Sequence, residues 1–197
     1  MSTEIVSALV VFAVVASVTP GPNNLMLLAS GVNFGFRRTL PHLLGVLVGF
    51  AILLTAVGLG IGALVERFPA LHTLLKVVGG AYLLYLAWKI SMSRALHEES
   101  AGQGPLTFLE AALFQWVNPK AWMMGLAAMA AYTDPDHYTL TLAIVVAVFC
   151  LVGIPSASIW AGFGSALKDW LNHPVRIKWF NIGMGLALVA SLWPMLK

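Results

Sequence analysis

The chain has 197 residues, of which 59% are hydrophobic and 10% are charged. An average soluble domain has roughly 45–50% apolar and about 25% charged residues, so this chain has too little charge to cover a soluble surface. Its formal net charge of +3 is too small to indicate a nucleic-acid partner. We therefore predict an all-α integral membrane protein that lies in a lipid bilayer.

Six segments are long and apolar enough to cross a bilayer, which takes roughly 20 residues of helix. They cover residues 5–30, 42–65, 71–90, 108–132, 140–167 and 179–196. Residues 1–4 contain no lysine or arginine, which argues against a cleaved signal peptide, so we expect the first segment to be retained. We predict a single domain of six transmembrane helices over residues 1–197.

The first predicted span contains a helix-breaking motif at its centre, Thr19-Pro20-Gly21-Pro22-Asn23-Asn24. Proline removes a backbone donor and blocks the preceding helical turn. In hydrocarbon, the backbone groups freed in this way are tolerated only where protein or a water-filled cavity covers them. We therefore expect a broken helix at Pro20, Gly21 and Pro22, next to a polar site of the kind that binds substrate in secondary transporters.

The second span and the loop before it carry two glycine patterns, Gly31-xxx-Gly35 and Gly45-xxx-Gly49. Such patterns are typical of helix faces that approach a neighbouring helix closely. They also permit a homodimer. His42, at the start of the second span, is expected to lie at the membrane interface.

The longest polar stretch, residues 91–105, divides the chain into halves of three spans. We predict repeat 1 over residues 1–95, a cytoplasmic linker over 91–106 and repeat 2 over 106–197. Because the number of spans in each half is odd, the halves insert with opposite topology, as inverted repeats do. Val18-Thr19-Pro20 in the first span corresponds to Val117-Asn118-Pro119 in the fourth.

Lys120 is the charged residue that lies deepest in a predicted span. It follows a second expected break, at Pro119, and lies roughly 15–20 Å along its helix at about 1.5 Å per residue. A charge at this depth costs about 2.5–3.5 kcal/mol on insertion scales. No carboxylate lies at comparable depth, since Glu110 is nearly three turns earlier on the same helix. The ammonium therefore either binds a substrate carboxylate or is satisfied by helix-end carbonyls that a proline frees.

Four amide side chains lie beside the expected breaks: Asn23, Asn24, Gln115 and Asn118. Each offers two donors and an acceptor oxygen, so together they can hydrogen-bond both ends of a zwitterion. The same side chains are suited to cap broken helix ends or to bond across helices. The two roles are compatible, and we predict all four, together with Lys120, as substrate-binding residues.

A third break is expected in the fifth span, at Gly153-Ile154-Pro155-Ser156. This motif lies near the middle of the charge-free run from residue 137 to residue 167. An ordinary proline kink is the alternative, because such kinks are common in membrane helices.

The distribution of basic residues predicts the orientation, because loops on the cytoplasmic side are enriched in lysine and arginine. Arg67, Lys76 and Lys197 lie on or near one side of the predicted spans. Seven basic residues lie on the other side: Arg37, Arg38, Lys89, Arg94, Lys168, Arg176 and Lys178. We therefore predict that both chain termini are outside the cytoplasm.

Motifs of ATP-binding proteins, serine hydrolases and zinc peptidases do not occur in the sequence. The five histidines have no metal-ligand spacing, so neither a metal nor another cofactor is predicted. Cys150, the single cysteine, cannot form an intrachain disulfide and is expected to serve packing. An intramembrane enzyme acting on a lipid-like substrate is the alternative function, but it would need a nucleophile and base near one interface. A membrane scaffold would not require polar residues at paired helix breaks.

Several motifs together resemble the LysE/RhtB family of bacterial amino-acid exporters. They are residues 19–24, Gly35-Phe36-Arg37, Gly45-xxx-Gly49-Phe50, residues 81–89 and Val117-Asn118-Pro119-Lys120, and the resemblance covers nearly the whole chain. It implies secondary active export of small amino acids across the bacterial cytoplasmic (inner) membrane, coupled to an ion gradient. The first motif is most similar to that of members that export threonine, homoserine, or cysteine and O-acetylserine.

Antiport of protons usually requires a titratable group at the site. Lys120 and Glu110 are the candidates, because Lys120 lies at mid-depth and Glu110 is the nearest carboxylate. A buried lysine can lose its proton at moderate pH. We hypothesise that protonated Lys120 binds the substrate carboxylate and takes part in coupling to protons or another ion.

Overall fold

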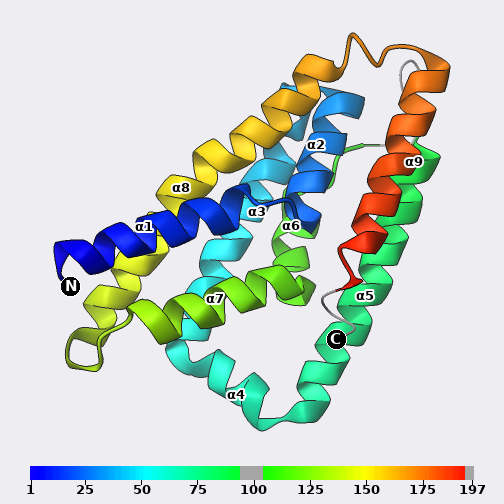
Figure 1. Ribbon diagram of the computed structural model, residues 1–197. Helices are drawn as coiled ribbons and strands as arrows, with labels where there is room; N and C mark the ends of the chain where they lie inside the picture. The colour runs from blue at the N-terminus through cyan, green and yellow to red at the C-terminus, as the bar shows by residue number, and fades with distance from the viewer. Residues whose placement is uncertain (94–103, 194–197) are drawn as a thin grey trace.

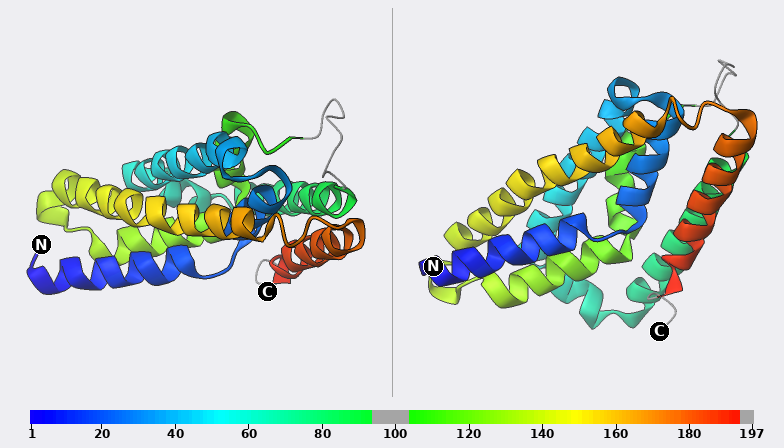
Figure 2. Two further views of the ribbon diagram at one scale, coloured as in Figure 1. Left: turned by 90° about the horizontal axis from the view of Figure 1, so that it is seen from above. Right: turned by 45° about the horizontal axis from the view of Figure 1, so that its top comes forward.

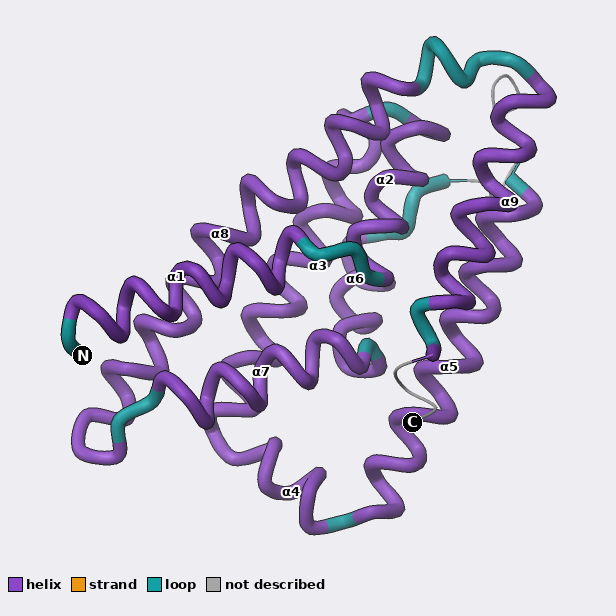
Figure 3. The backbone as a smooth tube through the Cα atoms, viewed as in Figure 1, coloured by secondary structure: helices purple, strands orange, loops and turns teal. Residues whose placement is uncertain are grey.

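Helices make up most of the described chain, which comprises residues 1–93 and 104–193 of the computed structural model (Figure 1; Figure 3). The longer helices are α1 (Thr3–Val18), α2 (Pro22–Phe34), α3 (Phe36–Ala56), α5 (Pro69–Met92), α7 (Pro119–Tyr132), α8 (Tyr138–Leu167) and α9 (Pro174–Ala190). The shorter elements are the π-helical turn η1 (Val57–Ile61), α4 (Gly62–Arg67), α6 (Phe108–Phe114) and the 3-10 turns η2 (Gln115–Val117) and η3 (Pro135–His137). These residues contain no β-strand, so the predicted all-α class is confirmed.

Three helical segments are individually long and apolar enough to cross a membrane: Phe36–Ile61, Thr73–Met92 and Pro135–Leu167. A fourth crossing results if α1 and α2, which are bent by 53° at a short break, form one span. The predicted spans over residues 108–132 and 179–196 correspond to shorter helices, α6 with α7 and the 17-residue α9. These lengths agree with a multi-pass membrane protein. By length and composition alone they account for three or four spans and not for all six that the sequence predicts.

The predicted linker over residues 91–106 is described only at its ends. Helix α5 continues to Met92, and the next helix begins at Phe108. Residues 94–103, including Arg94, and the C-terminal Lys197 lie outside the described residues.

The break between α1 and α2 lies where the sequence predicts it. Thr19, which precedes Pro20, has extended backbone angles (φ −56°, ψ 131°), because a following proline disfavours the helical conformation. Pro22 then occupies the first position of α2, where its fixed φ suits a helix and its missing N–H is not needed. Pro20 and Gly21 form the non-helical connection.

The span over residues 108–132 is interrupted by the same device. Helix α6 begins with a capping box, in which Thr107 and Glu110 satisfy each other's backbone N–H groups. The helix tightens into η2, and Asn118 is extended (φ −86°, ψ 109°) because Pro119 follows it. Pro119 opens α7 at its first position.

The third expected break is not present, because α8 runs as one helix of 30 residues through Pro155. A proline removes a single backbone hydrogen bond from the ladder, and tertiary packing can outweigh that loss. Here α8 packs against α1, α2 and α3 (Figure 1). The hydroxyl of Ser156, next to the proline, donates to the Ser17 carbonyl at 2.9 Å and so ties the helix to α1.

Glycines allow the helices of this bundle to approach closely. A Cβ at Gly31 would lie 2.2 Å from the Ala161 carbonyl oxygen, and one at Gly45 would lie 2.3 Å from that of Phe108. The two glycine patterns therefore serve the α2–α8 and α3–α6 contacts within the chain. Helices α5 and α9 form a further pair, which lies side by side in each view (Figure 2) and contacts the rest mainly through α2 and η2.

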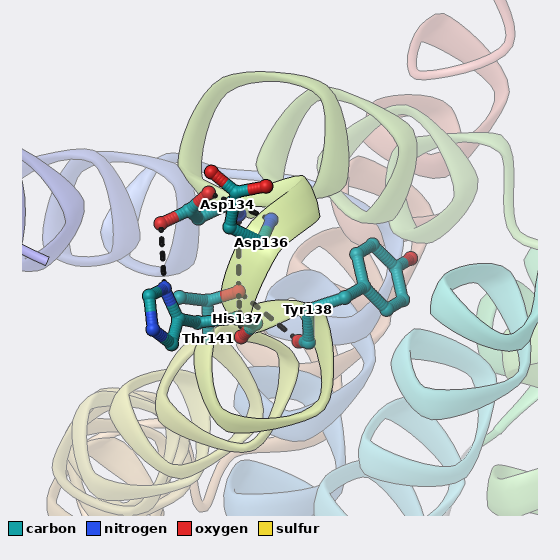
Figure 4. A network of polar contacts seen from close by, with 5 residues as sticks. All are labelled: Asp134, Asp136, His137, Tyr138 and Thr141. Carbon is teal, nitrogen blue, oxygen red and sulfur yellow. Dashed lines mark hydrogen bonds and ion pairs between the residues drawn. The ribbon is translucent and has the colours of Figure 1, made fainter.

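A polar turn before α8 is organised by Asp134 (Figure 4). Its carboxylate accepts from the backbone N–H of Asp136 at 3.0 Å and lies 3.4 Å from Nδ1 of His137, while its own N–H donates to the Thr141 hydroxyl at 3.0 Å. The backbone hydrogen bond from Asp136 and the neighbouring His137 lower the pKa of the exposed Asp134 carboxyl. The network caps the 3-10 turn η3, and none of its residues lines the cavity between the two helix breaks.

Candidate functional site

The two interrupted helices meet at a cavity. Its volume is about 80 Å³, measured as the space open to the centres of water molecules, and a single water takes roughly 10–15 Å³ by that measure. The cavity therefore has room for several waters or for a small polar molecule. Its polar lining comes from both breaks and from α8: Ser17, Asn23, Asn24, Asn118, Lys120 and Ser156.

Lys120 reaches across the cavity to the other break. Its Nζ donates to the Thr19 carbonyl oxygen at 2.5 Å, and that oxygen is left free by the end of α1. Within the described ranges the one ion pair joins His137 and Asp134, so Lys120 has no carboxylate partner there. The sequence allowed two partners for this ammonium, a substrate carboxylate or a helix-end carbonyl, and in the structure it binds the helix-end carbonyl.

The carbonyl groups at the end of α1, that of Thr19 included, also accept hydrogen bonds from other side chains. Asn24 Nδ2 donates to the Ser17 carbonyl at 2.8 Å and to that of Thr19 at 3.0 Å. Ser156 donates to Ser17 as well, at 2.9 Å. Side chains of α2, α7 and α8 therefore all converge on the last turn of α1, and Asn24 caps the broken helix.

Asn23 and Gln115 join the two breaks directly. Asn23 Nδ2 donates to Gln115 Oε1 at 2.8 Å, and Gln115 Nε2 returns a bond to Asn23 Oδ1 at 3.1 Å. Gln115 is fully buried and also donates to the Ala111 carbonyl at 2.9 Å. Asn23 lines the cavity, whereas Gln115 lies behind it as a support.

Asn118 lies at the start of α7, where its side-chain oxygen accepts from the backbone N–H of Lys120 at 3.1 Å. It is a helix cap that also lines the cavity. Glu110 is the predicted residue that does not join the site. Its carboxylate accepts from the backbone N–H and hydroxyl of Thr107 at 2.7 and 2.8 Å, and it does not line the cavity.

The helix ends give the cavity two electrical poles. The N-termini of α2 and α7 both face it, and helix N-termini favour anions. The C-terminus of α1 faces it too, and helix C-termini favour cations. Lys120 starts at the N-terminus of α7, and its ammonium reaches the C-terminal end of α1 at Thr19. Together the helix N-termini, the ammonium and the carbonyl groups suit a molecule that carries both a carboxylate and an ammonium group.

Two kinds of lining residue were missed by the sequence prediction. Ser17 and Ser156 belong to helical runs without any polar pattern, and only a nearby proline motif marks each of them. The apolar wall comes from α3, α7 and α8, and no local motif identifies it: Val46, Leu47, Phe50, Met124, Phe149 and Ala157. Cys150 also lines the cavity, besides packing within α8.

A cavity with polar side chains between broken helices, inside a bundle of apolar helices, is the kind of site that multi-pass membrane transporters have. The chain belongs to the LysE type translocator family, whose sequence model matches residues 14–190. The resemblance inferred from the motifs is thereby confirmed, and the protein is a transporter and not an enzyme.

Among curated proteins, the chain is similar to the cysteine/O-acetylserine efflux protein of Salmonella typhimurium (strain LT2), with 32% identity over 191 residues. It is 31% identical to the protein of the same name from Escherichia coli (strain K12). Each alignment covers 96% of both chains. No solved structure matches the chain.

Proposed function

We propose that this protein exports a small amino acid, of the cysteine or O-acetylserine kind, across the cytoplasmic (inner) membrane of a bacterium. The substrate class is supported by the names of relatives that match over 96% of their length. The observation that carries the proposal is the meeting of Lys120, two helix N-termini and one helix C-terminus at a single cavity.

Binding proceeds as an exchange of partners at Lys120. The substrate carboxylate draws the lysine ammonium away from the Thr19 carbonyl oxygen, because an ionised acceptor makes the stronger hydrogen bond. The Thr19 oxygen then accepts from the substrate ammonium. Asn23 and Asn118, which line the same cavity, supply further hydrogen bonds to the zwitterion. Both alternatives for Lys120 therefore describe successive states of one residue.

The architecture that suits this role is six spans in two inverted repeats, over residues 1–95 and 106–197. Its support is the shared design of the two breaks, each with an extended residue, a proline at the first position of the next helix and a lining asparagine. Alternating access then rocks one repeat against the other around the cavity. The distribution of basic residues supports an orientation with both termini outside the cytoplasm.

Export is coupled to protons or another ion, and Lys120 is the stronger candidate for the coupling group. Glu110 is engaged in a helix cap away from the cavity, whereas Lys120 lies in it. Any homodimer would use helix faces other than those of Gly31 and Gly45, which are occupied by α8 and α6.

The test is uptake of labelled O-acetyl-L-serine into inside-out membrane vesicles with an imposed proton gradient. Lys120→Met is expected to reduce uptake about tenfold or more, because a hydrogen bond between charged groups is lost. Lys76→Met is the matched control, since Lys76 lies on α5 away from the cavity lining. Normal uptake with unchanged pH dependence in both Lys120→Met and Lys120→Arg would remove this lysine from the mechanism.

A further inference from the structure

A second and larger cavity lies between α2, α3 and α5. Its volume is about 290 Å³ by the same measure, and it shares no lining residue with the first cavity. Its wall is partly apolar, from side chains such as Met26, Leu86 and Leu106. The polar lining comes from five further side chains: Ser30, Asn33, His42, Lys89 and Ser93.

His42 differs from the rest of this wall because its buried polar atoms have no partner. The residue is 1% exposed, and its two ring nitrogens are the only buried side-chain nitrogen or oxygen atoms of the described residues that lack a hydrogen-bond partner. Buried polar groups are nearly always paired, and a neutral imidazole has one donor and one acceptor to satisfy. The hydrogen-bond partner of this ring must therefore be a molecule that enters the cavity or a protein group that moves toward it.

Ser30 and Asn33, which line the same cavity on α2, have partners within the protein. Ser30 shares a hydrogen bond with Thr39 at 2.9 Å. Asn33 donates to the Ala29 carbonyl and exchanges two bonds with Asn181, at 2.8 and 2.9 Å. This contrast separates His42, which is available for a ligand, from side chains that hold α2 against α9.

The two cavities follow one another along the same two helices. On α2, Asn23 lines the first cavity and Met26 lines the second; on α3, Val46 lines the first and His42 the second. Each step is about one helical turn, or roughly 5.4 Å. The second cavity lies toward the end of the bundle that carries Lys89.

We propose that the second cavity is a second binding site for the transported amino acid, which it occupies before it reaches the first cavity. The Lys89 ammonium meets the substrate carboxylate, the His42 ring bonds one of its polar ends, and the apolar wall receives its side chain. This inference rests on the proposed function and adds a site to it. With the predicted orientation, the second cavity opens toward the cytoplasm.

The experiment uses thiols in the two cavities as separate reporters. The native Cys150 reports on the first cavity, and S30C with Cys150→Ala reports on the second. Each protein is labelled with a charged methanethiosulfonate in inside-out vesicles, with and without O-acetyl-L-serine, and is then purified and analysed by mass spectrometry. We expect the amino acid to slow labelling at both positions.

Lys120→Met separates the two sites. It is expected to abolish the protection of Cys150 but to retain the protection of S30C. In S30C, His42→Leu should raise the half-protecting concentration about tenfold, whereas His42→Gln, which keeps hydrogen-bonding groups, should change it much less. If O-acetyl-L-serine does not slow the labelling of Cys150 in the protein with native Lys120, that result would count against the proposed function.

Three results would overturn the second site itself. The first is labelling of S30C that O-acetyl-L-serine does not slow in the Lys120→Met protein. The second is protection that His42→Leu leaves unchanged. The third is an equal loss with His42→Gln and His42→Leu, since that would assign a purely structural role to the residue.

Discussion

Lys120 and Thr19 lie 101 positions apart in the chain, yet the lysine ammonium donates to the threonine carbonyl oxygen at 2.5 Å. The contact links the start of α7 to the end of α1, so it joins the two helix breaks. It does so through a charged side chain, which costs free energy to bury in a membrane. An ammonium held by a neutral carbonyl is one that a carboxylate can draw away. Substitutions around this contact, and around the helix breaks that form it, should therefore affect transport or stability.

Gly21→Ala should impair transport without unfolding the protein. A Cβ at Gly21 would lie 2.7 Å from Cδ of Lys120, so the lysine side chain must move away from Thr19. The backbone at Gly21 is extended (φ −164°), and alanine therefore adds no strain. We expect uptake of O-acetyl-L-serine to fall several-fold, while the free energy of unfolding in SDS changes by less than about 0.5 kcal/mol.

The matched control for Gly21 is Gly80→Ala on α5, where an added Cβ meets no atom within 4 Å. Uptake by this variant should stay at the wild-type level. Unimpaired uptake by Gly21→Ala would show that the position of the Lys120 side chain has no part in transport.

Gly164→Ala should destabilise the bundle itself. A Cβ there would lie 2.2 Å from the Leu28 carbonyl oxygen, and backbone cannot yield as a long side chain does. Overpacking of this kind costs about 1–3 kcal/mol. The measurement is the free energy of unfolding in SDS. Gly162→Ala, two residues earlier on α8 and with no atom within 4 Å of the added Cβ, should be neutral or slightly stabilising. Equal stability of the two variants would contradict the close α2–α8 crossing.

Both helix breaks could be predicted from the sequence because proline acts locally. Thr19 and Asn118 each precede a proline and leave the helical conformation, as residues before proline usually do. Pro155 shows where this reasoning fails. A proline inside a helix is tolerated when neighbours hold that helix on several sides, and the packing of α1, α2 and α3 on α8 is a property of the whole fold.

The partners of the site residues could not be predicted in the same way. The sequence did not decide whether Lys120 binds a carbonyl or a carboxylate, because its partner in the structure is a residue 101 positions away. His42 was expected at the membrane interface, yet it is buried with both ring nitrogens unpaired. A single histidine in an apolar run carries no local signal of a cavity beside it.

Asp134 makes the turn before α8 sensitive to acid. Because hydrogen bonds lower the pKa of its carboxyl, its contribution to stability is present above the pKa of the unfolded chain, about 3.9, and is lost as the pH falls through the lower folded value. The unfolding temperature of the wild type should therefore fall as the pH is lowered from about 5 through the pKa of the unfolded chain, with the uptake of about one proton. Asp134→Asn should flatten this decline, whereas Asp136→Asn should not, because Asp136 bonds through its backbone. The same decline in Asp134→Asn as in the wild type would assign it to other groups.

The amide pair of Asn23 and Gln115 should show an energetic coupling that neither residue has alone. Asn23→Ala leaves Oε1 of the fully buried Gln115 without its donor, whereas Gln115→Met of similar length leaves Asn23 beside a cavity that water can enter. We therefore expect Asn23→Ala to cost about 1–2 kcal/mol of unfolding free energy in SDS and Gln115→Met to cost less. The double variant should cost less than the sum of the two by about 1 kcal/mol, in the range of interhelical hydrogen bonds in membranes. Additivity within about 0.3–0.5 kcal/mol would mean that the pair does not hold the breaks together.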